Sequence, residues 1–322
     1  MEIEANSSYV KNQKLVALVV KITITTALIY WIIAQIEITQ LLNTLQSTKA
    51  SYLIAAIAIH SLAFMLFSVR WWYLYHIQDR NCKYAQIVGS YYLGLFFNNI
   101  LPTGMGGDVV RILRLKGKGL NTHILVSSTL VDRILGLVSI LLMGLVAVIF
   151  TPNLDLSADI KMVIAALGIA LTLFLIFIFS NCTAKLANRF FNRENKFSHF
   201  IINIVSTLHE YRRKRTQVLG SLCISFVAQY LIIFCYLLIG ASIGMDIPFS
   251  IYFTIIPIVF VASSLPISIG GLGVRESVLV SLLLFFQVDP QMAIALSLLY
   301  FAIIVLITLP GAILIANKNL NK

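Results

Sequence analysis

Charged residues are scarce in this chain: Asp, Glu, Lys and Arg make up 11% of its 322 residues, against about 25% in ordinary soluble domains. Hydrophobic residues make up 59%, and the mean hydropathy is +0.91. This composition excludes a soluble globular protein. A bilayer core about 30 Å thick needs about 20 apolar residues for each helical crossing. The length therefore accommodates several crossings within one integral membrane domain, 1–322, and no separate catalytic domain.

The sequence also lacks the short motifs of common enzymes and metal proteins. Its four cysteines form no CxxC pair, and its five histidines form no HExxH or other ligand spacing. A GxSxG turn and a GxxxxGK[ST] loop are absent as well, so hydrolase chemistry and ATP-driven transport have no support. We expect no enzymatic activity, no metal and no cofactor. The net charge of +11 favours membrane orientation over nucleic-acid binding in a chain this apolar.

Six apolar stretches are long enough to cross a bilayer as helices. They lie at 15–35, 51–75, 124–150, 160–180, 216–241 and 290–316. Two further apolar segments, 84–101 and 249–265, are shorter and run into glycine-rich stretches. We therefore predict an all-α polytopic membrane protein with six full crossings and two broken or re-entrant glycine-rich segments. The N-terminus is too long for a cleaved signal and has no small-residue cleavage site, so we expect the first stretch to be retained as a helix.

Lysine and arginine are distributed unequally between the segments that connect the crossings. With a cytoplasmic N-terminus, the inner segments carry eighteen of these residues and the outer segments carry two, Lys49 and Lys161. Because positive charge is retained on the cytoplasmic side, we expect both termini to be cytoplasmic and the chain to lie in the plasma (inner) membrane. If one short segment crossed and the other did not, a basic connection would move outside. Both therefore re-enter, or both cross.

The connection 181–215 combines apolar residues at helical spacing with a basic cluster, Arg212 to Arg215. This pattern predicts a cytoplasmic amphipathic helix that lies on the inner leaflet near anionic headgroups. The alternative is a basic stop signal that only orients the next crossing.

An internal repeat relates the two halves of the chain. Residues 101–111 and 265–275 are identical at six of eleven positions without a gap, at an offset of 164 residues. The same offset superimposes the crossing before each motif and the crossing after it, so the repeat spans 51–150 and 215–314. An odd number of predicted crossings separates the two units, which are therefore inverted. Inverted repeats with broken hydrophobic segments at matching positions are typical of transporters.

Each glycine motif precedes an arginine. A helix that begins near Gly107 and Asp108 would present free N–H groups one turn from Arg111, an arrangement that suits phosphate oxygens. The second unit repeats it with Gly270, Gly271, Gly273 and Arg275. The alternative is that these glycines, with Gly106, permit only a tight turn and close helix packing. A carboxylate repels phosphate, so we expect Asp108 to cap its helix or to pair with Arg111.

Other polar residues at membrane depth are candidates for the same substrate path. Asp132 and Arg133 lie in an apolar stretch, where charge is costly and therefore often functional. Adjacent helix residues point about 100° apart, so we expect Asp132 to pair with Arg275, or Arg133 with Glu276, in a structural or a gating network. Arg70 precedes an aromatic run and is expected to snorkel to the interface.

Asn98 and Asn99 precede the first glycine motif. Side-chain amides are costly against lipid, so we expect them to line the same cavity, and helix-to-helix hydrogen bonds are the alternative.

The runs FFNNILPTGMGGDVVR (96–111), VDRILG (131–136) and SLPISIGGLGVRE (264–276) together resemble the lysylphosphatidylglycerol synthase transmembrane-region family of flippase-like proteins, over nearly the whole chain. The resemblance implies a lipid translocator for an anionic phospholipid or a polyprenyl-linked lipid. It also implies membrane lipids as partners and a separate lipid-synthesising enzyme, since this chain has no synthase domain. A small-anion permease and an intramembrane lipid-modifying enzyme are the alternatives.

Overall fold

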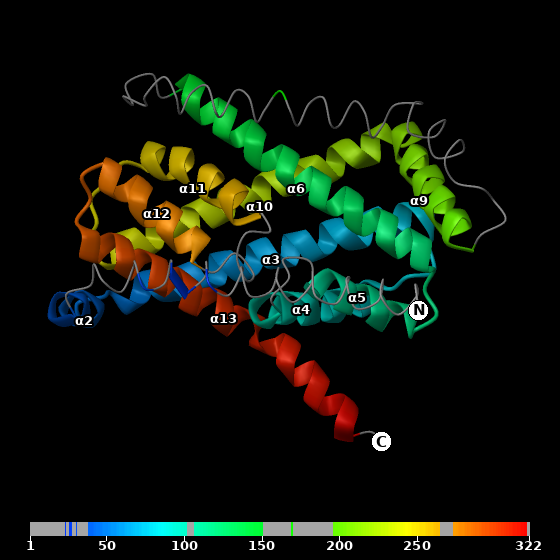
Figure 1. Cartoon of the computed structure of the whole chain (residues 1–322), viewed down its shortest axis with the longest axis horizontal. Helices are drawn as coiled ribbons and strands as arrows, with labels where there is room; N and C mark the ends of the chain where they lie inside the picture. Colours follow the sequence, from blue (N-terminus) through cyan, green and yellow to red (C-terminus); the bar gives the residue numbers. More distant parts are fainter. Residues whose placement is uncertain are drawn as a thin grey trace, which may run out of the picture.

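The long apolar stretches fold as helices, because in an apolar surrounding each backbone N–H and C=O must find its partner within the backbone. A computed structural model of the chain describes residues 38–101, 106–150, 196–264 and 273–320, together with 23, 26, 27, 30 and 169. Helices are the only regular elements among these residues (Figure 1). They are α2 (Ile38–Gln46), α3 (Ala50–Gln78), α4 (Tyr84–Ile100), α5 (Gly106–Lys116), α6 (Thr122–Phe150), α9 (Lys196–Arg213), α10 (Arg215–Ser242), α11 (Phe249–Ser264), α12 (Val274–Phe285) and α13 (Pro290–Leu320).

Four of the predicted crossings are confirmed as helices long and apolar enough to span a membrane: α3, α6, α10 and α13. The predicted crossings at 15–35 and 160–180 lie outside the described residues, apart from isolated positions. The two short segments are the helices α4 and α11. At 1.5 Å per residue, the 17 residues of α4 extend for about 25 Å, which is less than a full bilayer core.

The helix α3 packs against α10 in the most extensive helix pair, and both run along the long axis of the molecule (Figure 1). The helix α4 packs on α13, and α11 packs on α6. At the offset of the repeat, α3 corresponds to α10, α4 to α11 and α6 to α13. The contact of α4 with α13 is therefore the contact of α11 with α6 with the two units exchanged. A twofold relation between the units would produce this exchange, and the inverted repeat itself stays a prediction.

Hydrogen bonds fix which connections share an end of the molecule. At one end, the Lys49 N–H donates to the Ser242 carbonyl at 2.9 Å. At the other, the Tyr75 hydroxyl accepts from the Asn121 N–H at 3.2 Å, and Lys214 Nζ donates to the Ile77 carbonyl at 2.6 Å. The pair α4–α5 consequently begins and ends at the same end of the molecule (Figure 1). Re-entry of this pair into a membrane stays a prediction.

Within 181–215, where the sequence predicts an amphipathic helix, the structure has the helix α9 over 196–213. Its buried side chains include Ile204, Thr207 and Tyr211, and α9 packs on α6. The Tyr211 hydroxyl donates to the Leu74 carbonyl in the last turns of α3 at 2.8 Å. Part of the apolar face of α9 is therefore covered by protein, while Arg213 remains exposed. Its position on a membrane leaflet stays a prediction.

Candidate functional site: a buried arginine–aspartate cluster

Five charged side chains from three helices meet inside the first unit. We call this group the arginine–aspartate cluster; it consists of Arg70 from α3, Asp108 and Arg111 from α5, and Asp132 and Arg133 from α6.

Asp132 lies between two arginines. Its Oδ1 accepts from Arg70 Nε at 2.7 Å, and its Oδ2 accepts from Arg111 Nη2 at 3.4 Å. The other end of the Arg70 guanidinium donates to Ser225 Oγ on α10 at 2.7 Å. The carboxylate of Asp132 therefore joins three helices, and Ser225 adds a fourth.

Asp108 also binds two arginines. Its Oδ1 lies 3.1 Å from Arg111 Nη2, the i, i+3 partner predicted from the sequence, and its Oδ2 lies 2.8 Å from Arg133 Nη2. Arg111 is thus shared by both carboxylates. A carboxylate in the first turn of α5 is also favoured by the positive end of the helix dipole.

The cluster carries more positive than negative charge. Three guanidinium groups face two carboxylates, which leaves a formal charge of +1. The side chains of Arg70, Arg111 and Asp132 are at most 5% exposed, whereas that of Arg133 is 45% exposed. The accessible positive charge of the site therefore belongs to Arg133, in a surrounding where an unbalanced charge is costly.

Aromatic rings cover the buried arginines. The guanidinium carbon of Arg111 lies 4.0 Å from the centroid of the Trp71 ring and 5.2 Å from that of Tyr91. A cation above a ring face is attracted by its quadrupole. The Nε atom of Arg111 is buried without a hydrogen-bond partner. Arg111 accordingly retains one free donor in the interior of the cluster.

The close approach of α4 and α5 positions Arg111. An added side-chain carbon on Gly107 would lie 1.9 Å from the Gly94 carbonyl oxygen, so only glycine permits this spacing. The Gly107 N–H donates to Asn98 Oδ1 at 2.9 Å. Asn98 therefore caps α5 and uses an N–H group that we expected to be free for an anion. Gly106 and Gly107 are both buried.

Asn98 and Asn99 do not line one cavity together. Asn98 faces α5, whereas Asn99 Nδ2 donates to Thr308 Oγ1 on α13 at 2.9 Å. The alternative reading of these amides, as hydrogen bonds between helices, describes both of them. Adjacent positions on α4 point in different directions, which explains why they bind different helices.

The predicted cross-pairs of Asp132 with Arg275 and of Arg133 with Glu276 are wrong. Arg275 pairs with its neighbour Glu276, whose other oxygen accepts from the Gly273 N–H at 2.7 Å. Adjacent residues meet here because the Glu276 side chain turns back over the start of α12 to cap it, and the long Arg275 side chain reaches it there. Both oxygens of Glu276 have partners in α12 or in its N-cap residue, Gly273. Gly270 and Gly271 lie outside the described residues.

The interpretation of Arg70 as a snorkelling residue is also wrong, since this residue is 4% exposed and anchors Asp132. Sequence reasoning missed it as a site residue. A signal was present: eight residues separate Arg70 from Gln78 at the end of α3, about 12 Å of helix, which is far for a side chain to reach the interface.

The described residues bring no group of three or more His, Cys, Asp or Glu side chains together that could hold a metal ion. The cluster instead offers guanidinium donors and two carboxylates that are already paired. Such an arrangement can bind one additional anion by charge and by charge-assisted hydrogen bonds.

Comparison with known proteins assigns the chain to a family, and the match includes the whole cluster. Residues 18–311 match the lysylphosphatidylglycerol synthase TM region. The chain belongs to this family. The matched range includes all five residues of the cluster and both glycine motifs, so the resemblance drawn from the three sequence motifs is confirmed.

One curated relative of the chain is a UPF0104 membrane protein from Pyrococcus horikoshii. It is 21% identical over 312 residues, which cover 89% of this chain and 91% of the relative. Together with the apolar helices, the family establishes a multi-pass membrane protein.

Proposed function

We propose that the protein moves an anionic lipid between the leaflets of the inner membrane, and that the arginine–aspartate cluster binds the headgroup phosphate. The observation that carries the proposal is the excess positive charge of a cluster buried among membrane helices. Charged side chains at this depth are costly, and they are retained where they serve a substrate path.

A phosphate would first meet Arg133. This residue is the accessible member of the cluster, and its guanidinium is held by Asp108 through Oδ2 alone. A phosphate oxygen can displace or share that contact, because a guanidinium presents five donors in one plane. The +1 charge of the cluster would then be balanced by one negative charge on the lipid.

Arg111 and Arg275 remain our candidates for further phosphate contacts, with different surroundings. Arg111 keeps its free Nε but is otherwise enclosed by two carboxylates and by Trp71. Arg275 is neutralised by Glu276. Either contact therefore requires a rearrangement of ion pairs, of the kind that alternating access between inverted repeats would produce.

The test is lipid movement by the purified protein in phosphatidylcholine vesicles that contain a trace of fluorescent phosphatidylglycerol. Bleaching of the outer leaflet by dithionite reports the lipid that has crossed. We expect Arg133→Gln to slow movement about tenfold or more, since a hydrogen bond to a charged group contributes roughly 1.5–3 kcal/mol and each 1.4 kcal/mol is tenfold.

The matched control is Arg80→Gln, which removes an exposed arginine outside the cluster and should leave movement unchanged. Equal rates for wild type and Arg133→Gln would remove the headgroup assignment. Inhibition by soluble sugar phosphates, with no movement of any lipid probe, would instead identify a small-anion permease.

A separate enzyme that synthesises the lipid is a proposed partner.

A further inference from the structure

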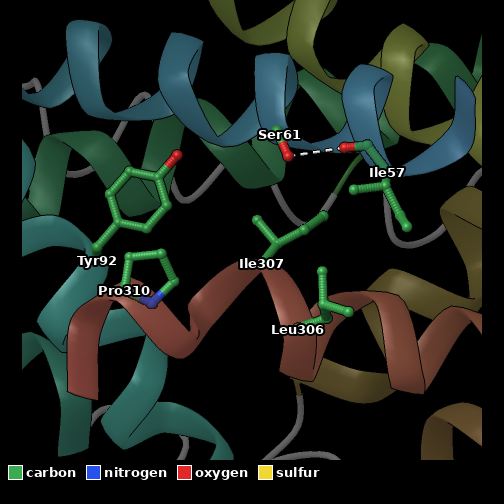
Figure 2. Close-up of a pocket in the computed structure, with 6 residues that line it drawn as sticks. All are labelled: Ile57, Ser61, Tyr92, Leu306, Ile307 and Pro310. Carbon is green, nitrogen blue, oxygen red and sulfur yellow. Dashed lines mark hydrogen bonds between the residues drawn. The ribbon is translucent and has the colours of Figure 1, made fainter. Parts of the chain in front are cut away.

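An apolar pocket lies between α3 and α4 of the first unit and α13 of the second. It has a volume of about 330 Å³, and Figure 2 shows its lining from three helices. The lining residues are Ile57 and Ser61 from α3, Tyr92 from α4, and Leu306, Ile307 and Pro310 from α13.

One of the lining residues, Pro310, is a proline inside α13. Pro310 has no N–H to donate to the carbonyl of Leu306, and its ring crowds that carbonyl, so the helix bends. Figure 1 shows the last turns of α13 leaving the bundle. The helices α3 and α13 touch only briefly, whereas the corresponding pair, α10 and α6, packs more extensively. The pocket occupies the space between α3 and α13.

The lining suits hydrocarbon better than a polar group. The Ser61 hydroxyl donates to the Ile57 carbonyl of its own helix at 2.7 Å (Figure 2), so the Tyr92 hydroxyl is the other polar side-chain group of the lining. No charged side chain borders the pocket. A volume near the lower limit of roughly 300–1,000 Å³ for ligand pockets holds part of one chain rather than a whole lipid.

One wall of the pocket, Leu306, and apolar side chains on the same two helices, α3 and α13, outside the lining are exposed. Leu306 is 52% exposed, and Leu309 and Ile313 on α13 and Ile54 on α3 are exposed as well. Exposed apolar side chains on a membrane helix contact hydrocarbon. An occupant therefore enters from the bilayer.

Neighbouring residues of α4 contact the charged cluster and the pocket. The centroid of the Tyr91 ring lies 5.2 Å from the guanidinium carbon of Arg111. Its neighbour Tyr92 lines the pocket. We propose that this pocket binds a hydrocarbon tail of the transported lipid while the arginine–aspartate cluster holds its headgroup. The inference rests on the proposed function for the identity of the lipid, and its test measures binding and not transport.

The test places a photoreactive benzophenone amino acid at Leu306, on the pocket wall. The matched control position is Leu309, which is 47% exposed against 52% for Leu306 but does not line the pocket. The purified protein is irradiated in vesicles of phosphatidylcholine and phosphatidylglycerol, and intact-mass spectrometry counts the lipid adducts. We expect several-fold more adduct at Leu306 than at Leu309.

A second variant, Ser61→Phe, fills the pocket and should lower the adduct at Leu306 several-fold while leaving that at Leu309 unchanged. If Ser61→Phe does not fold, Ser61→Leu is used in the same comparison. The tail site is overturned if the amounts of adduct at Leu306 and Leu309 are equal, or if neither Ser61→Phe nor Ser61→Leu lowers the adduct at Leu306. Either result would mean that the probe reacts only with bulk lipid. Failure of the headgroup assignment is seen separately, in the movement assay of Arg133→Gln.

Discussion

At the scale of single residues, the buried ion pair of Arg70 and Asp132 joins α3 to α6 within the site. Both side chains are about 5% exposed, and the residues are separated by 62 positions in the sequence. Removing one partner of a buried pair leaves an uncompensated charge, whereas removing both leaves none. The sequence could predict the local pair of Asp108 with Arg111, because i, i+3 spacing on a helix fixes it. It could not predict Arg70 with Asp132, because only the packing of α3 against α6 brings them together.

A double-mutant cycle follows from this pair. We expect Asp132→Asn to cost about 3–5 kcal/mol, since breaking a buried ion pair has this effect. The double variant with Arg70→Gln should cost less than the sum, with a coupling of about 0.5–3 kcal/mol. The measurement is thermal unfolding in detergent. The control cycle combines Asp132→Asn with Arg275→Gln. Asp132 and Arg275 do not pair, so the effects of these two substitutions on stability should add. Additivity in both cycles would contradict the Arg70 contact.

At the scale of helices, the contact of α4 with α5 depends on glycine. A methyl group on Gly107 would meet the backbone oxygen of Gly94 at 1.9 Å and the side-chain oxygen of Asn98 at 2.6 Å. Because a backbone oxygen cannot move away alone, the two helices must separate. Arg111 lies one turn further along α5, so its position above Trp71 depends on this spacing.

We therefore expect Gly107→Ala to destabilise the protein by about 1–3 kcal/mol, the usual cost of overpacking, and to slow lipid movement. The control is Gly220→Ala in α10, where an added side-chain carbon has no neighbour within 4 Å. There alanine should stabilise by roughly 0.5–1 kcal/mol. Thermal unfolding and the vesicle assay, applied to both variants, check the pair. A stable, fully active Gly107→Ala would show that the close approach is not required.

The helices themselves were predictable, since apolar length determines α3, α6, α10 and α13 almost to their ends. The surfaces against which the elements pack were not predictable. The basic, amphipathic pattern of α9 predicted a membrane surface, but an apolar face does not reveal whether lipid or protein covers it. In the structure, Ile204 and Tyr211 are buried where α9 packs on α6. Arg275 and Glu276 likewise pair within α12, because a glutamate at the third position of a helix can turn back to its start.

At the scale of the whole molecule, exposed basic residues gather at one end. Arg80, Lys118 and Arg213 are exposed in connections that the bonds of Tyr75 and Lys214 hold together. The exposed acids Asp246 and Asp289 lie in connections at the opposite end, with α2 and the junction of α12 and α13 (Figure 1). Apart from Lys49 at the acidic end and Glu210 near the basic end, both of which are exposed, these connections follow the charge distribution on which the predicted orientation depends.

The last prediction concerns this orientation. Single cysteines at Lys118 and Arg213 should react with a maleimide only after it gains access to the cytoplasm, and those at Asp246 and at Asp155, which is outside the described residues, should react from outside. The native Cys82 should add little background labelling, because burial raises the pKa of its thiol to about 11 and leaves little reactive thiolate at neutral pH. The measurement is labelling of whole cells with a membrane-impermeant maleimide, before and after permeabilisation. The more lysines and arginines a connection carries, the more strongly it is retained inside. Labelling of Lys118→Cys from outside would therefore show that the protein has the opposite orientation, with the exposed Arg133 nearer the opposite leaflet.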